Sequence, residues 1–344
     1  MVIGATVSGR VADILERRQP AAGCEFRRGD GNPANMFYST GTVTMQPMVR
    51  AAILAVAAVW PALGPVAGMA QEIPELQNST VEIAYMEPLN PAHRAIYDRL
   101  RQRQVLEQLR QFLAPLELPR KLLVKIEGCR GVVNAWYSND AVTLCYEYID
   151  FIRGVALKGE PPQGFAREDA IVGPFVDVVF HELAHAVFDM LKIPILGREE
   201  DAADQVAAFL LMQFGKNVAR RTLSGTAYFY GAIAAQQSVN NDIFADVHGT
   251  HAQRFFNTLC IAYGGDPNTF NDFVQKGLLP RHRVASCPYE YQQVQYAFGR
   301  LILPKVNQHL MKLVQSRDWL RPEDGLDSPP PNSPITGDTP GPAR

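Results

Sequence analysis

The chain has 344 residues, of which 47% are hydrophobic and 20% charged, and its formal net charge is −2. This composition is ordinary for a globular protein with a sizeable core, and the length allows one large or two small domains. Proteins that bind nucleic acid usually carry a basic excess, so the near-neutral charge argues against a nucleic-acid partner.

The first part of the chain reads as a leader and not as part of a domain. Residues 1–44 contain arginine and glycine with little apolar periodicity, which suggests a start codon assigned too far upstream. Residues 45–70 follow the pattern of a secretory signal peptide, with Arg50, an apolar run and small residues before a cleavage site. We therefore expect an exported protein, periplasmic or extracellular. A membrane is a partner only if residues 51–70 stay uncleaved as a marginal anchor.

Helix and strand signals follow the leader in a definite order. Apolar residues recur at helical spacing over residues 90–113, which predicts one amphipathic helix. Three apolar, β-branched or aromatic runs then predict strands at residues 121–126, 131–137 and 141–146. We expect these strands to form a small sheet immediately before the next long helix.

That next helix contains the sequence HELAH at residues 181–185. Residues four apart share a helix face, so His181 and His185 can point their imidazoles at one metal ion. Glu182 is close enough to take a proton from a water molecule on that ion, as a zinc hydrolase requires. The alternative is a pair of core histidines bound to backbone carbonyls, but the spacing around a glutamate favours a metal. We expect Pro174 in the first turn of this helix.

A third protein ligand is available on the following segment. Residues 197–212 read as a second helix that is acidic at its start and apolar afterwards. Glu200 and Asp204 lie four apart, so Glu200 can bind Zn²⁺ while Asp204 accepts a hydrogen bond from the outer nitrogen of a ligating histidine. Acidic residues also favour a first helical turn without any metal, which is the expected explanation for Glu199 and Asp201.

Several segments together resemble a bacterial metallopeptidase family of otherwise unknown function. They are the run HELAHAVFDMLKIPILGREEDAADQ and the shorter segments NAWY, LCYE and DVH, at residues 181–205, 134–137, 144–147 and 246–248. The arrangement also looks like that of gluzincins, in which a downstream helix supplies a glutamate ligand. This resemblance implies an α+β, zincin-like fold with a small N-terminal sheet packed on the active-site helix and a mostly helical C-terminal part.

The resemblance also suggests substrate-binding and catalytic residues. Asn134, Ala135 and Tyr137 are similar to the edge strand with which thermolysin-like enzymes hold a peptide backbone, although an ordinary hairpin with an aromatic face is equally compatible. In the gluzincin scheme a C-terminal histidine stabilises the oxyanion, and His248 is the candidate, with Arg283 or Tyr137 assisting. The alternative is an ordinary histidine on a surface loop.

The C-terminal half is expected to be helical and to end in a disordered tail. Helices are predicted at residues 228–239, 251–263, 269–277 and 289–313. The tail at residues 321–344 is rich in proline and small polar residues. We expect residues 71–320 to form one metallopeptidase domain.

Four of the five cysteines follow the leader, namely Cys129, Cys145, Cys260 and Cys287. Four cysteines allow two disulfides in three connectivities. Pairing of sequence neighbours, Cys129 with Cys145 and Cys260 with Cys287, is expected because each bond would close a local loop. The alternative is four buried free thiols.

These patterns predict a zinc metallopeptidase with Glu182 as general base and a peptide or protein as substrate. The alternative is an exported zinc-binding or scaffold domain that keeps the fold without catalysis. A structural zinc site is usually closed by a fourth protein ligand, and the sequence indicates none, which favours the enzyme.

Overall fold

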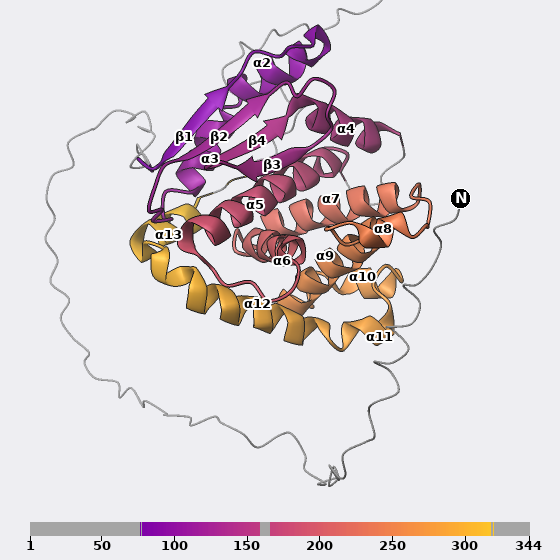
Figure 1. Cartoon of the computed structure of the whole chain (residues 1–344). Coiled ribbons are helices and arrows are strands. Elements are labelled where there is room, and N and C mark those ends of the chain that lie inside the picture. The colour runs from indigo at the N-terminus through magenta and orange to yellow at the C-terminus, as the bar shows by residue number, and fades with distance from the viewer. Residues whose placement is uncertain (1–75, 77, 159–165, 318, 320–344) are drawn as a thin grey trace, which may run out of the picture. The chain divides into compact units, whose positions relative to one another are not determined.

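The computed structural model describes residues 76, 78–158, 166–317 and 319 (Figure 1). The expected leader, signal peptide and disordered tail lie outside the described residues, so these three assignments stay predictions.

A four-stranded sheet forms the N-terminal layer of the described chain. Its strand order is β1-β2-β4-β3, in which β1, β2 and β4 run parallel and β3 pairs antiparallel with β4 at one edge. The strands are β1 (Val81–Tyr85), β2 (Leu122–Glu127), β3 (Ala135–Ser138) and β4 (Ala141–Cys145). Strands β2, β3 and β4 were predicted, whereas β1 was missed.

The helical segment before β2 is interrupted where one continuous helix was predicted. A short 3-10 turn, η1 (Pro91–His93), leads into α2 (Arg94–Gln102) and α3 (Val105–Phe112). Between them Gln104 has φ 51°, in the left-handed region that a continuing helix cannot use. Helix α4 (Tyr146–Leu157), which starts directly after β4, was also missed by the sequence analysis.

Helix α5 (Asp169–Leu191) is the central element, with the sheet on one side and the later helices on the other (Figure 1). It starts before Pro174, which lies inside the helix and not in its first turn as predicted. Its mostly buried residues contribute to the hydrophobic core, and Lys192 ends the helix with φ 54°. Among the described residues, only α5 is long and apolar enough to cross a membrane, and 72% of that apolar stretch is buried inside the protein.

Close backbone packing fixes α7 (Lys216–Ala234) against α5. A Cβ atom on Gly173 of α5 would lie 2.4 Å from the carbonyl oxygen of Thr222, and one on Gly225 of α7 would lie 1.9 Å from that of Asp169. Glycine is therefore required at both positions, because any side chain would force the helices apart.

The remaining helices complete the domain. They are α6 (Glu199–Met212), α8 (Asp242–Ala245), α9 (His251–Gly265), α10 (Asn271–Gln275), α11 (Arg281–Val284), α12 (Cys287–Leu301), η2 (Leu303–Lys305) and α13 (Gln308–Gln315). The helix predicted at 228–239 is the end of α7, which stops at Ala234, and the one predicted at 289–313 is broken at η2. The predicted α+β class with a mostly helical C-terminal part is confirmed.

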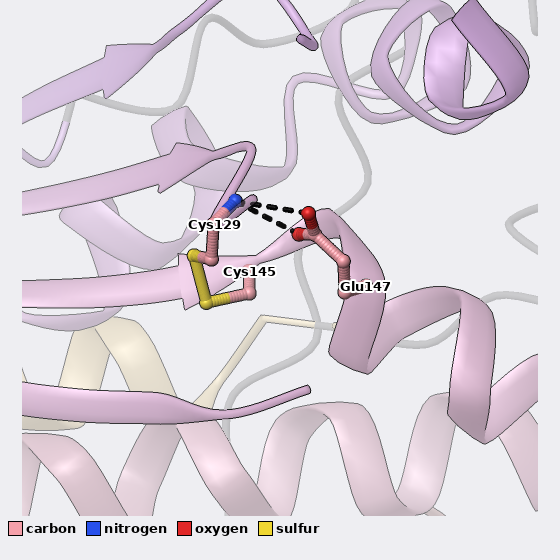
Figure 2. Close-up of side chains that lie close together, drawn as sticks. All are labelled: Cys129, Cys145 and Glu147. Atoms are coloured by element: carbon pink, nitrogen blue, oxygen red, sulfur yellow. Dashed lines mark hydrogen bonds between the residues drawn. A yellow bond between two sulfur atoms is a disulfide. The ribbon is translucent and has the colours of Figure 1, made fainter. Parts of the chain in front are cut away.

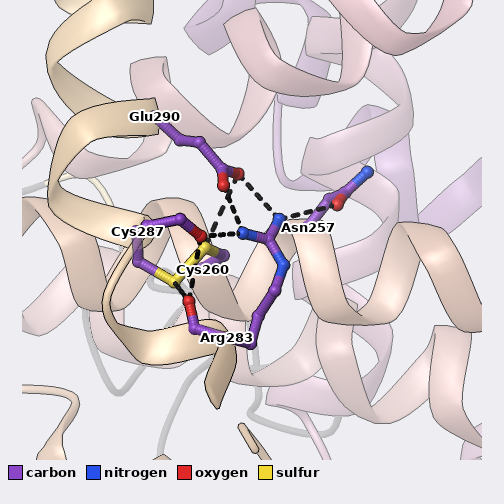
Figure 3. The surroundings of a disulfide bond; sticks show 6 residues. Asn257, Cys260, Arg283, Cys287 and Glu290 are labelled. Carbon is purple, nitrogen blue, oxygen red and sulfur yellow. Dashed lines mark hydrogen bonds and ion pairs between the residues drawn. A yellow bond between two sulfur atoms is a disulfide. The ribbon is translucent and has the colours of Figure 1, made fainter. Parts of the chain in front are cut away.

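Two disulfides link segments of the fold, Cys129 to Cys145 and Cys260 to Cys287. Cys129 binds Cys145 at the end of β4, where the Glu147 carboxylate also accepts a hydrogen bond from the backbone N–H of Cys129 (Figure 2). The same carboxylate accepts a second one from the backbone N–H of Gly131. Cys260 binds Cys287 and joins α9 to α12 (Figure 3). These are the two pairs predicted, so the free-thiol alternative is wrong. The bonds are consistent with an exported protein.

Candidate active site

A cleft of about 880 Å³ lies between the edge strand β3 and helices α4 to α9. The imidazoles of His181 and His185 and the carboxylates of Glu182 and Glu200 line it. It contains polar and apolar regions, and the polar region surrounds the two histidines.

Three donor atoms from α5 and α6 converge in this region. The Nε2 atoms of His181 and His185 lie 3.2 Å apart, and the Oε2 atom of Glu200 lies 3.0 Å from the first and 3.2 Å from the second. Two ligands of a tetrahedral ion with bonds of about 2.0 to 2.1 Å are separated by about 3.3 Å. The three atoms are therefore already spaced as three ligands of one small metal ion.

The charges of this region also fit a cation. Hydrogen bonds from His181, His185 and His248 hold the pKa of Glu200 well below its usual range, so its carboxylate is ionised. Burial lowers the pKa of His181, but Asp204 and Glu200 outweigh burial and raise it to about 9. Three carboxylates, those of Glu199, Glu200 and Asp204, lie within 2.8 to 3.2 Å of the two imidazoles. A divalent ion would balance their charge in place of the protons.

Each histidine has its own carboxylate on the outer nitrogen. The Nδ1 atom of His181 lies 2.8 Å from Asp204, and that of His185 lies 2.8 Å from Glu199. Explaining Glu199 by the helix dipole alone was therefore incomplete, since its side chain also orients a histidine. Asp201 pairs with Arg198 at the start of α6, which agrees with the dipole explanation.

Glu182 lies beside the donor triangle and is 6% exposed. Burial raises the pKa of its carboxyl group, while a hydrogen bond from the backbone of Tyr137 on β3 opposes the rise. The proton affinity of this carboxylate is therefore above that of an ordinary glutamate, which favours a role as general base.

The open edge of β3 faces Glu182. The carbonyl of Asn134 accepts a hydrogen bond from Cys145 and so belongs to the ladder with β4. Backbone groups alternate between the two sides of a strand, so those of Ala135 and Tyr137 point to the open edge. The Tyr137 hydroxyl lies 2.8 Å from the carboxylate of Asp189 and 3.1 Å from that of Asp140, and its single proton serves one of them at a time. Tyr137 itself lines the cleft, so the suggestion that it assists an oxyanion stays a prediction.

His248, in the loop between α8 and α9, reaches the same region. Its Nε2 atom lies 2.9 Å from Glu200, and Asp246 holds its Nδ1 atom at 3.2 Å. Arg283, suggested as an assisting residue, instead pairs with Glu290 next to the Cys260–Cys287 disulfide and does not line the cleft (Figure 3).

A buried network behind the histidines was missed by the sequence analysis. Arg254 of α9 donates to both oxygens of Asp204, at 2.7 and 2.5 Å, and its guanidinium lies 4.5 Å from the ring centre of Tyr230. The Tyr230 hydroxyl donates to Asp177 at 3.1 Å. Only Asp177 carried a sequence signal, because it precedes His181 by four residues and so shares its helix face.

Two imidazoles and a carboxylate thus converge beside a buried glutamate, in an arrangement that could hold a metal ion. The model of the family described as "Putative metallopeptidase" (DUF4344) matches residues 85–302. The chain therefore belongs to this family, and membership supports a metal-dependent peptidase acting on peptides or proteins. No curated protein and no solved structure matches the chain.

Proposed function

We propose that the protein is a zinc-dependent metallopeptidase in which His181, His185 and Glu200 hold the ion. The observation that carries this proposal is the donor triangle with edges of 3.0, 3.2 and 3.2 Å next to the buried Glu182. Two imidazoles and one carboxylate suit zinc, whereas calcium and magnesium prefer oxygen ligands throughout.

A bound zinc ion would polarise the scissile carbonyl and acidify water. Glu182 then takes the proton of the attacking water on its carboxylate and delivers it to the leaving amine. The backbone N–H of Tyr137 orients Glu182 for both transfers. The free backbone groups of Ala135 pair with an extended substrate, and the Nε2 atom of His248 donates to the developing oxyanion.

Replacing Glu182 by glutamine tests this mechanism. We expect E182Q to bind one zinc per chain, as the wild type does, and to lose peptide hydrolysis by roughly 100-fold or more, because the general base is gone. The matched control is E82Q, which changes an exposed glutamate on β1 outside the cleft. Undiminished hydrolysis by zinc-loaded E182Q would show that Glu182 is not the base.

A structural zinc site is the second candidate, and the position of His248 favours it. One donor atom from each of His181, Glu200 and His248 lies within 4.8 Å of the others, so His248 is placed to become a fourth ligand and close the site. The variant H248A separates the two functions. The peptidase predicts slower turnover with little change in zinc affinity, whereas a closed site predicts a large loss of zinc affinity.

We also propose that the mature protein begins near Gln71 and works outside the cytoplasm. The two disulfides support this proposal, because structural disulfides form and persist in oxidising compartments and are rare in the cytosol. N-terminal sequencing of the protein from its native host tests it. An N-terminus upstream of residue 45 in the purified protein would contradict signal cleavage.

A further inference from the structure

One end of the cleft is apolar and aromatic, in contrast to the polar region around the histidines. It is formed by side chains from α4, α5 and α7, namely Tyr148, Phe151, Val178, Phe229 and Ile233. The rings of Tyr148, Phe151 and Phe229 contact one another, with centroids 5.9 to 6.4 Å apart. We call these five residues the aromatic wall.

The aromatic wall lies next to the proposed general base. Val178 precedes Glu182 by four residues on α5 and therefore lies one turn away on the same face. Tyr148 lines the same cleft as Glu182. A side chain next to the bond being cut would therefore meet this wall.

The wall also has an exposed apolar surface with no partner among the described residues. Phe229 is 2% exposed and fixed in the core, whereas Phe151 is 40% exposed and forms the outer end of the wall. Exposed aromatic surface is unfavourable in water, and covering it with an apolar group is favourable. Because the surface continues the catalytic cleft, the occupant that fits is a substrate side chain.

The charges along the cleft exclude one class of substrate residue. Among the described residues that line it, Arg254 is the only arginine or lysine, and Asp204 already binds it on both oxygens. Asp242 and Asp246 add negative charge at the α8 side. An acidic substrate residue would find no free cation at the wall and would lose its hydration there.

We propose that the aromatic wall is a specificity subsite that takes a large apolar side chain adjacent to the scissile bond and rejects acidic ones. The inference rests on the proposed peptidase function and names its substrate class, namely peptides rich in phenylalanine, leucine or similar residues. Phe151 is the specificity-determining residue that this subsite presents to the substrate.

Short blocked peptides that differ only in a Phe, Leu, Ala or Asp residue test the proposal with the zinc-loaded full chain. We expect cleavage next to Phe and Leu, and poor cleavage of the Asp peptide. In F151A, kcat/KM for the Phe peptide should fall about tenfold while that for the Ala peptide changes little. The control is L157A, an apolar residue on the same helix α4 that is more exposed than Phe151, at 58% against 40%, and does not line the cleft. Equal effects of F151A and L157A would overturn the proposal.

Binding to zinc-loaded E182Q separates this inference from the proposed function. If the wild type cleaves the peptides without preferring apolar residues, the subsite is wrong and the peptidase remains. If the wild type cleaves no peptide, the peptidase is wrong, and calorimetry with E182Q still decides the subsite. Tighter binding of the Phe peptide than of the Asp peptide, weakened by F151A, supports it, and equal binding overturns it.

Discussion

The two histidines of the proposed zinc site are oriented with unequal firmness. Asp204, the partner of His181, has a side chain 16% exposed, whereas Glu199, the partner of His185, is 52% exposed. Water screens an exposed contact, so the Glu199 interaction is the weaker one. His181 is accordingly the better fixed ligand, and His185 has more freedom to adjust when an ion binds.

Asp177 gives the clearest prediction of pH dependence. Burial raises its pKa to about 7 from a usual value of 3.8, so the folded protein retains a proton that the unfolded chain has already lost. Stability is therefore lost as the pH rises between about 4 and 7, by at most ~4 kcal/mol. The variant D177N keeps an acceptor for the Tyr230 hydroxyl and cannot ionise. We expect it to match the wild type near pH 4 and to unfold at a higher temperature at pH 8.

Thermal unfolding of D177N and the wild type at both pH values measures this difference in stability. Other titrating groups affect both proteins equally, so their contributions cancel when the two unfolding temperatures are subtracted at each pH. D98N on the exposed surface of α2 is the control. A variant less stable than the wild type at pH 8 would mean that ionised Asp177 is stabilised by Arg254 and that the sign is reversed.

At the scale of elements, the sequence analysis predicted contacts between residues that are close in the sequence and missed contacts between residues that are far apart in it. The spacing of His181, His185 and Glu200 could be read because helical periodicity and one short turn bring them together. Arg254 follows Asp204 by 50 residues, and only the packing of α9 against α6 joins them. Helix α4 was missed because Tyr146, its first residue, continues the apolar run of β4. The break between α2 and α3 was missed because the left-handed residue there is Gln104, and not a glycine or proline that would indicate a break.

Because Arg254 on α9 binds Asp204 on α6, we predict that Arg254 affects zinc affinity although it is not itself a zinc ligand. R254M leaves the buried Asp204 without its cation, which destabilises the fold by roughly 3–5 kcal/mol and releases the partner that orients His181. We expect zinc affinity to fall about 10- to 100-fold, as measured by competition with a chelating dye.

Arg220 provides a matched control for this variant. Like Arg254, Arg220 pairs with both oxygens of one carboxylate, here that of Asp272. Its guanidinium also lies over an aromatic ring, 5.0 Å from the ring centre of Phe273. R220M should therefore lose stability but keep its zinc affinity. If R254M and R220M both bind zinc as tightly as the wild type, Arg254 has a structural role only. R254K, which keeps a positive charge next to Asp204, would then also bind zinc as the wild type does.

At the scale of the whole molecule, the two disulfides stabilise the fold similarly but bear differently on the cleft. In the chain-entropy model, loops of 16 and 27 residues correspond to about 3 and 3.5 kcal/mol. Cys129–Cys145 anchors the loop that leads into β3 (Figure 2). Glu147 also accepts hydrogen bonds from two backbone N–H groups of this loop. Cys260–Cys287 joins α9 to α12, and neither cysteine lines the cleft.

Removing each bond by a double serine variant should therefore separate stability from substrate binding. Both variants should unfold at lower denaturant concentration, by similar amounts. KM should rise only in C129S/C145S, because the edge strand that pairs with the substrate loses its anchor while the zinc ligands on α5 and α6 are unchanged. Urea unfolding and steady-state kinetics measure the two effects. An equal rise of KM in C260S/C287S would mean that general loosening of the domain, and not the position of β3, limits substrate binding.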